Sequence, residues 1–332
     1  MPDGTTTLSK TNVPKPKDLV ETDGFLAAKN SDTPPPTVQS FWHQTRLSPL
    51  EEHLVSEGLV TAPTPTLVQR QPDESMVRSL LDYADENDDL LTHVAQRVLA
   101  ANFYAYPFPF FIIDQVLPEE LYREYLRGIP SRDVFEQHPR NGTLRLGLDG
   151  YRRLSSNHEM VGARIVRALD AVREHLIARF AILIPGVYSL FFGEKYTRRL
   201  TTLTLERLPL HLDDRAHRHS QGPHLDGPDR IFTWLLYLPE DDSQRHRGTN
   251  IFAARASTAP FDPLETYISG QPHNLDLQFS AKIPYVPNRL IAFVDPPVSF
   301  HGTSKILDDQ RRMFMQEFVT MTQNSFLKVF GD

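Results

Sequence analysis

The stretch 222-GPHLDGPDRIFTWLLYLPEDD-242 carries the strongest structural signal in this chain. It begins with a histidine and an aspartate two residues apart and leads within a few residues into the apolar run 231-IFTWLLYL-238. A run of this length, rich in β-branched and aromatic residues, predicts a buried strand. Side chains two residues apart in an extended chain point to the same face. We therefore expect His224 and Asp226 to lie side by side, close to the start of a strand.

Further short strands are predicted after residue 186, separated by turns. The corresponding stretches are 200-LTTLTLERL-208, 249-TNIFAA-254, 289-RLIAFV-294 and 312-RMFMQEFV-319. Short strands at such close spacing are typical of an antiparallel barrel or jelly roll.

Helical spacing dominates the earlier part of the chain. Apolar residues recur with a helical period between about 46 and 104 and again between 159 and 182. Between these two segments, 110-FFII-113 predicts a short strand, and Pro118 opens a further helix. Helices that come first and strands that come later favour a single α+β unit, in which helices buttress one sheet.

Residues 1–40 are rich in Pro, Thr, Ser, Asp and Lys and show no apolar period. Such a segment buries too little surface to offset the entropy of ordering it, so we predict a flexible tail there. The predicted organisation continues with a helical extension at 41–108 and a main domain at 109–332.

The composition of the chain indicates a globular protein and excludes several kinds of partner and site. The chain has 332 residues, 40 % of them hydrophobic and 23 % charged, as in an ordinary globular protein. A formal net charge of −7 argues against a nucleic-acid partner, which needs a basic face. The lack of cysteine excludes disulfides and thiolate metal sites. Neither a signal peptide nor a bilayer-spanning stretch is evident, so we expect a cytoplasmic protein that does not enter a membrane.

A third candidate ligand completes a metal site. His301 stands in 300-FHGT-303, shortly after the predicted strand at 289–294. Two imidazoles and one carboxylate on one face of a metal leave positions open for other ligands, the arrangement of non-haem iron(II) oxygenases. The pattern predicts a metal site formed by His224, Asp226 and His301.

A second H-x-D pair lies just upstream, at His211 and Asp213. Its surroundings, 211-HLDDRAHRHSQ-221, are polar throughout, so we expect a surface loop there. The preferred pair, His224 and Asp226, leads instead into a strong strand.

The order of these motifs resembles the 2-oxoglutarate/iron(II) dioxygenase superfamily, in its prolyl-4-hydroxylase-like branch. The similarity runs from about 109 to 319 and includes FFIIDQVLPEEL, HLD, a YLP strand with a GT turn, PNRLIAF, FHGT and RR. The resemblance implies a double-stranded β-helix, a cupin-like jelly roll with buttressing helices, in which the predicted triad binds iron(II). It also implies that O2 and 2-oxoglutarate are consumed, that succinate and CO2 are released, and that a second substrate is oxidised, usually by hydroxylation.

An arginine is expected to bind the distal carboxylate of 2-oxoglutarate, since a guanidinium can form a bidentate pair with it. Arg311 and Arg312 are adjacent, and in a strand only one of them points inward. We prefer Arg311, because its distance from His301 matches the family pattern.

The predicted strand at 231–238 has two different faces. One face is wholly apolar and is expected to pack against helices; the other carries Thr233 and Tyr237 and is expected to line the lumen. A hydroxyl from this mixed face could donate to a 2-oxoglutarate carboxylate. The alternative is that Tyr237 satisfies its hydroxyl within the protein.

Three hypotheses about function follow. The preferred one is an oxygenase of biosynthetic or tailoring type that acts on a small molecule, either free or held on a carrier protein. The second is hydroxylation of a protein side chain, such as a prolyl residue. The third is a cupin-like protein that binds a metal without 2-oxoglutarate chemistry. The sequence leaves the oligomeric state open, a homodimer included.

Overall fold

The computed structural model describes residues 13–22, 24–29, 36, 38–39, 48–60, 89–129, 131–137, 144–147, 164, 167–172, 183–184, 186–193, 205–207, 211–215, 221–227, 229–257, 259–304 and 312–321. In this part of the chain, helices are combined with antiparallel strands, as predicted.

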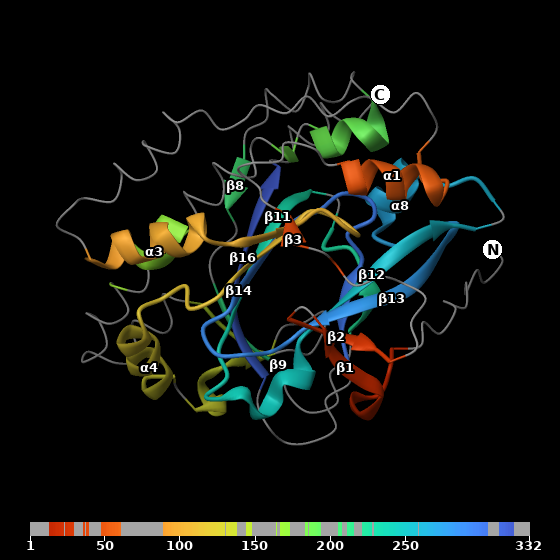
Figure 1. The fold of residues 1–332 in the computed structure, drawn as a ribbon. Helices are drawn as coiled ribbons and strands as arrows, with labels where there is room; N and C mark the ends of the chain where they lie inside the picture. Colours follow the sequence, from red (N-terminus) through yellow and green to blue (C-terminus); the bar gives the residue numbers. More distant parts are fainter. Residues whose placement is uncertain are drawn as a thin grey trace.

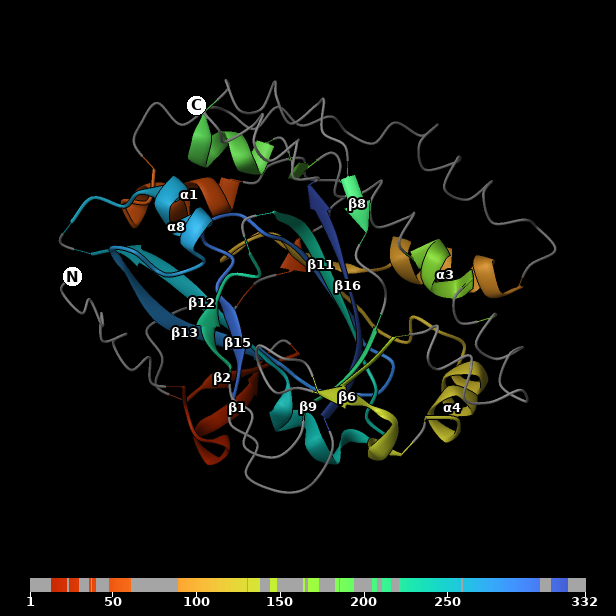
Figure 2. The same cartoon turned by 180° about the vertical axis from the view of Figure 1, so that it is seen from behind.

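Two antiparallel sheets face each other across the centre of the molecule (Figures 1 and 2). The smaller sheet has the order β1-β2-β13-β12-β15-β10. Its strands are β1 (Leu19–Thr22), β2 (Phe25–Ala28), β10 (Gln221–His224), β12 (Thr249–Ala256), β13 (Leu275–Ile283) and β15 (His301–Thr303).

The larger sheet has the order β3-β4-β5-β14-β11-β16-β9-β7-β6, with β8 beside β16. Its strands are β3 (Val38–Gln39), β4 (Asn102–Tyr104), β5 (Phe110–Ile113), β6 (Glu136–Gln137), β7 (Leu144–Gly147), β8 (Leu205–Arg207), β9 (His211–Arg215), β11 (Arg230–Tyr237), β14 (Leu290–Val294) and β16 (Arg312–Met321).

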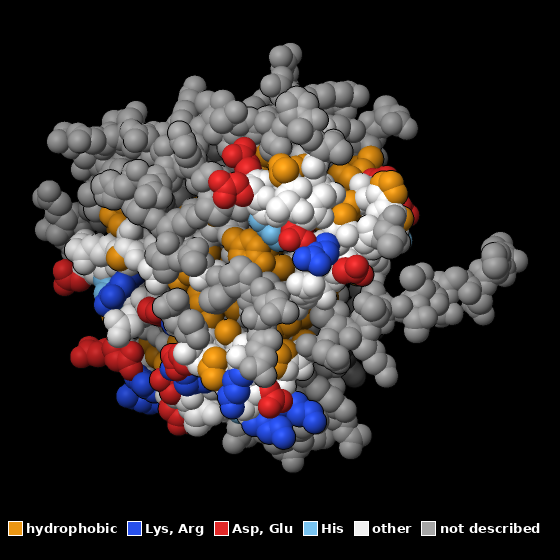
Figure 3. Space-filling view, turned by 45° about the vertical axis from the view of Figure 1, so that its right-hand side comes forward, with side chains coloured by type: hydrophobic (Ala, Val, Ile, Leu, Met, Phe, Trp, Pro, Cys, Tyr) orange, Lys and Arg blue, Asp and Glu red, His pale blue; other side chains and the backbone are white. Residues whose placement is uncertain are grey.

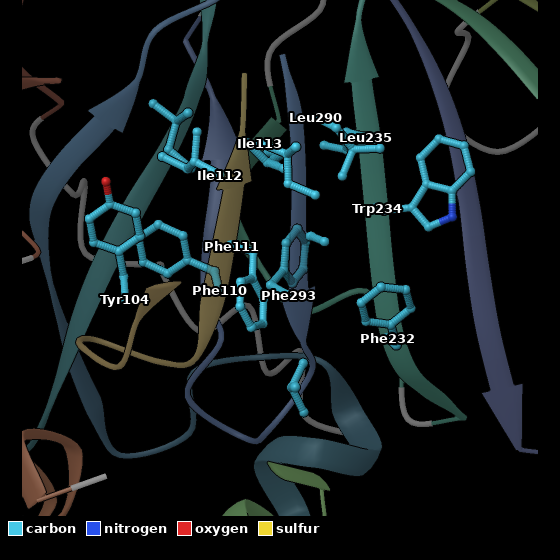
Figure 4. Close-up of a cluster of buried hydrophobic side chains, with 14 of the residues drawn as sticks. Tyr104, Phe110, Phe111, Ile112, Ile113, Phe232, Trp234, Leu235, Leu290 and Phe293 are labelled. Carbon is cyan, nitrogen blue, oxygen red and sulfur yellow. The ribbon is translucent and has the colours of Figure 1, made fainter. Parts of the chain in front are cut away.

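Strand β11 lies in the middle of the larger sheet, hydrogen-bonded to β14 on one side and to β16 on the other. All of its residues from Ile231 to Tyr237 are buried, which accounts for the nearly continuous apolar run in the sequence. Leu235 and Trp234 project from opposite sides of this strand, as the predicted two faces require (Figure 4).

Helices lie on the outside of the sheets (Figure 1). They are α1 (Ser48–Ser56), α3 (Asp89–Leu99), α4 (Glu119–Arg127) and α8 (Pro263–Ser269), with short 3-10 turns at η1 (Pro16–Asp18), η2 (Arg132–Val134) and η4 (Asp242–Arg247). Helix α3 buries Leu91, Val94, Ala95 and Val98, the spacing of a single apolar face. In α8, the Asp262 carboxylate caps the first turn by accepting from two backbone N–H groups, and Gly270 ends the helix with a positive φ. No described helix is both long enough and apolar enough to cross a membrane.

The predicted flexible tail at 1–40 is wrong for the hairpin β1–β2. Strand β2 pairs with β13 and thereby extends the smaller sheet, and Phe25 is fully buried against Tyr104 and Phe110. A few apolar residues in an otherwise polar segment are enough when they add to an existing sheet edge. The predicted boundary at 108 also passes between two paired strands, β4 and β5.

The interpretation of 211–221 as a surface loop is wrong for 211–215, which form strand β9 at the side of β16. The helices predicted for 46–104 and 159–182 are described in part, since residues 61–88 and most of 159–182 lie outside the described residues. The described parts of both segments are helical apart from turns and β4.

Candidate metal centre

The pairing of two strands brings the predicted ligands together. His224 is the last residue of β10 and His301 is the first of β15, and these two residues are directly opposite in the ladder. Asp226 follows β10 after one residue. One ligand atom from each of the three side chains lies within 4.8 Å of the others. The Nε2 atoms of His224 and His301 are 3.8 and 3.6 Å from Asp226 Oδ1.

The imidazoles are held in the tautomer that a metal requires. Nδ1 of His224 is 2.9 Å from the Gly222 carbonyl oxygen, and Nδ1 of His301 is 2.9 Å from that of Ser299. A carbonyl can only accept, so Nδ1 is the donor in both imidazoles, and in the neutral form of each ring the lone pair lies on Nε2. Ligating histidines in metalloproteins are commonly oriented in this way, so the residues present fit a divalent metal.

Asp226 is a buried carboxylate surrounded by positive or polarisable groups. Burial alone would raise its pKa, but His301, Arg230 and His224 together hold the pKa of Asp226 below its usual range. The Arg230 guanidinium, stacked 3.6 Å from the Phe318 ring centroid, reaches within 3.3 Å of Oδ1. Asp226 is therefore ionised and ready to bind a cation.

A second buried carboxyl group, Asp295, lies behind this ligand. It is 2 % exposed, and its Oδ1 has no hydrogen-bond partner among the described residues. Burial, and then the charge of Asp226, raise the pKa of Asp295 well above its usual range. The Thr233 hydroxyl lies between the two acids, 2.8 Å from Asp226 Oδ2 and 2.9 Å from Asp295 Oδ2.

A cavity extends from the three ligands along the inner face of β16. Its lining is formed by the triad together with Leu235, Thr249, Gly302, Thr303, Arg312, Phe314 and Gln316. Gln316 is buried, and its amide oxygen has no partner among the described residues. Most of the lining is therefore polar, and Leu235 and Phe314 are its apolar side chains.

Arg312 lies in this cavity, 1 % exposed, and is surrounded by the rings of Tyr237, Tyr285 and Phe314 at 5.9, 5.7 and 5.1 Å. Its Nε donates to the Arg247 carbonyl at 2.6 Å. No carboxylate among the described residues pairs with it. A buried guanidinium without an acidic partner is costly unless a ligand supplies the anion.

Arg311, the arginine preferred on sequence grounds, lies outside the described residues. Arg312, by contrast, lines the cavity, so among the described residues it is the arginine available to an anion there.

The two hydroxyls predicted to contact 2-oxoglutarate have partners within the protein. The Thr233 hydroxyl is held between the two acids, and the Tyr237 hydroxyl donates to Thr249 Oγ1 at 2.5 Å and accepts from the Thr249 N–H at 3.0 Å. The Tyr237 hydroxyl is therefore hydrogen-bonded within the protein, which was the alternative to a contact with 2-oxoglutarate. The alternative ligands His211 and Asp213 lie on β9, and their side chains are outside the described part.

Sequence patterns missed three buried polar residues near the site. Two of them are Asp295 and Gln316, both buried. Lys282 is 1 % exposed and donates to the His246 carbonyl at 2.7 Å and to Ser304 Oγ at 2.8 Å. Burial, and then the Arg312 cation, lower the pKa of Lys282 to about 8. A lysine within an alternating strand such as β13 gives no signal that it is buried.

The chain was compared with family models, curated proteins and solved structures, and matches were found among the solved structures. No family model and no curated protein matches the chain. Among solved structures, it is similar to a prolyl-4-hydroxylase from Pseudomonas putida at 14 % identity and a TM-score of 0.38, over 64 % of this chain and 92 % of that one. It is also similar to a prolyl hydroxylase from Trichoplax adhaerens, in complex with a hypoxia-inducible-factor peptide fragment, at 15 % identity and 0.40, over 76 % and 94 %.

A third similar structure is HygX from Streptomyces hygroscopicus with nickel, 2-oxoglutarate and hygromycin B bound. It shares 14 % identity with this chain at a TM-score of 0.33, over 64 % of this chain and 83 % of that one. At such identities and TM-scores, the likeness does not establish what this chain does, so its activity has to be inferred from the site.

Proposed function

We propose that the protein is an iron(II)- and 2-oxoglutarate-dependent oxygenase with a double-stranded β-helix fold. The observation that carries this proposal is that one cavity contains both a facial His-Asp-His triad and a buried arginine with no described acidic partner. A metal site by itself does not need the arginine. 2-Oxoglutarate would meet both requirements, because its keto-acid end can chelate a metal while its distal carboxylate pairs with a guanidinium.

The residues of the chain have separable roles in this proposal. His224 and His301 present their Nε2 lone pairs and Asp226 presents Oδ1. Arg312, in place of the predicted Arg311, pairs with the distal carboxylate of the cosubstrate. Leu235, Phe314 and the surrounding buried residues exclude water and so strengthen that ion pair. Iron(II) bound here would supply the redox chemistry that uses O2 and 2-oxoglutarate to oxidise a C–H bond, with release of succinate and CO2.

The substrate we propose is a small molecule, free or on a carrier protein. The cavity lining supports this choice, since it combines Leu235 and Phe314 with the amide oxygen of Gln316, which has no described partner and is available to a ligand polar group. The negative net charge and the surface in Figure 3, where acidic and basic side chains of the described residues lie interspersed, favour no nucleic-acid partner. Hydroxylation of a prolyl side chain is the alternative to be tested beside it.

The experiment is an anaerobic titration of metal-free protein with iron(II) and then 2-oxoglutarate, followed by visible absorption. A weak charge-transfer band is expected, and it should be lost in His224→Ala. Arg312→Met should still bind iron but should need on the order of 100-fold more 2-oxoglutarate, since it loses charge-assisted hydrogen bonds worth about 2–3 kcal/mol. Arg123→Met, which removes an exposed arginine on α4, is the matched control.

Three results would contradict parts of the proposal. Bound iron without any band would favour the cupin-like protein that does not use 2-oxoglutarate. An effect of Arg311→Met in place of Arg312→Met would restore the arginine preferred from the sequence. Succinate release stimulated by proline-containing peptides, and by no small molecule tried, would favour the protein hydroxylase.

A further inference from the structure

The two oxygens of Asp226 have different neighbours. Oδ1 faces the Nε2 atoms of His301 and His224, at 3.6 and 3.8 Å, and the Arg230 guanidinium at 3.3 Å. Oδ2 accepts from the Thr233 hydroxyl at 2.8 Å. The hydroxyl is thus the hydrogen-bond donor to the oxygen that does not face the imidazoles.

Thr233 is a rigid support for this contact. It lies in the middle of β11, paired with Phe293 on β14 and with Phe318 on β16, and it is fully buried. A β-branched side chain has few accessible rotamers, and the flanking strands leave its backbone no freedom to move. Asp226, by contrast, lies in the turn after β10. Thr233 on β11 is therefore the rigid partner, and it restrains the Asp226 side chain in the turn.

Asp295 lies on the other side of the same hydroxyl, and its burial needs an explanation. Its backbone is anchored, since its N–H donates to the Ile231 carbonyl at 3.0 Å and its carbonyl accepts from Tyr188 at 3.0 Å. The only described partner of its side chain is Thr233, at 2.9 Å. A buried carboxyl group with one unpaired oxygen lowers stability, so retaining it suggests a role in the site.

A threonine hydroxyl has one proton and cannot donate to two acceptors at the same time. The contact with Asp226 and the contact with Asp295 are both formed only when Asp295 donates to Thr233 and Thr233 donates to Asp226. In that arrangement the three side chains form one directional chain of hydrogen bonds that ends on the metal ligand.

We infer that Thr233 and Asp295 are positioning residues for the metal ligand Asp226. Asp295 orients the Thr233 hydroxyl, and that hydroxyl fixes the rotamer of Asp226 so that Oδ1 faces the metal. This inference rests on the proposed metal site. Removing partners of this kind commonly costs 10- to 100-fold in metal affinity.

The test measures the dissociation constant of Co(II), and the shape of its visible d–d bands, for the full chain. Thr233→Val should weaken Co(II) binding by about 10-fold or more and change the bands, and Thr233→Ser should restore both. Asp295→Ala should weaken binding in the same direction, whereas Asp295→Asn, which keeps a donor toward Thr233, should stay within about threefold of wild type. Thr266→Val, which removes a fully buried threonine hydroxyl in α8, is the control for general effects on packing.

The double variant Thr233→Val/Asp295→Ala tests whether the two residues act through one chain of hydrogen bonds. If Asp295 acts through Thr233, the double variant should bind Co(II) no more weakly than Thr233→Val alone. Additive losses, or wild-type affinity and bands in Thr233→Val, would overturn the inference. Failure of the metal site itself would look different, because His224→Ala would then bind Co(II) as tightly as wild type.

Discussion

Lys282 provides a quantitative test of how this fold buries charge. Its pKa is lowered from 10.5 to about 8, first by burial and then by the Arg312 cation. Each pH unit of such a change corresponds to about 1.4 kcal/mol, so burying the charged lysine costs about 3 kcal/mol. We expect Lys282→Met to remove this cost along with the two hydrogen bonds of the ammonium group.

The sign of the pH dependence follows from the direction of the change. Below pH 8 the lysine is charged in both the folded and the unfolded chain, and the full cost is present. Above that pH the folded chain loses the proton first, so wild-type stability rises until the unfolded chain also loses its proton near 10.5. The free energy of unfolding of wild type should therefore gain about 2–3 kcal/mol relative to Lys282→Met between about pH 7 and 10.

The assay is urea unfolding at three pH values between about 7 and 10, followed by tryptophan fluorescence, to which the fully buried Trp234 contributes. Titrations elsewhere in the chain cancel in the difference between wild type and variant. Lys29→Met is the matched control, because Lys29 is exposed and its ammonium group also donates to a backbone carbonyl. A difference between wild type and Lys282→Met that stays constant with pH would refute the reasoning.

Three other substitutions have clear expected outcomes. Gly248→Ala should prevent folding or cost more than about 4 kcal/mol, because a Cβ there would lie 1.6 Å from the Ile283 carbonyl oxygen; soluble expression and circular dichroism would check this. Trp234→Ala should lower the free energy of unfolding by about 3–5 kcal/mol through the cavity it leaves, and wild-type stability in urea would contradict that packing. Gln316→Leu should leave stability within about 1 kcal/mol of wild type or raise it, because its buried amide oxygen has no described partner; a large loss in urea unfolding would show that the amide is bonded.

The predicted strand at 231–238 and its two faces agree with β11 because both depend on local periodicity. Leu235 lines the cavity and Trp234 projects to the other side, as the alternation of side chains requires. Strands β12, β14 and β16 likewise lie within two residues of the stretches predicted at 249–254, 289–294 and 312–319, whereas β9, β10 and β13 were not predicted. The hairpin β1–β2 could not be predicted in this way, since its stability comes from pairing with β13.

In the candidate site, too, some features could be predicted from local sequence and others depend on the pairing of distant strands. His224 and Asp226 could be placed together from their spacing, and His301 could be added from the order of motifs. That the three side chains meet depends on the pairing of β10 with β15, which joins distant parts of the chain. The partners of Thr233 could not be predicted, because Asp295 reaches it from the end of another strand.

The sequence by itself determined the chemistry that is available: a two-residue ligand spacing, a central apolar strand with one polar face, and a late pair of arginines. Tertiary structure alone placed Arg312 in the cavity and brought the Thr233 hydroxyl to Asp226. It also brought Asp295 and Lys282 into the buried surroundings of the site. The physical reason is that side-chain direction repeats every two residues along a strand, whereas the partner that each side chain meets depends on registers between strands far apart in sequence.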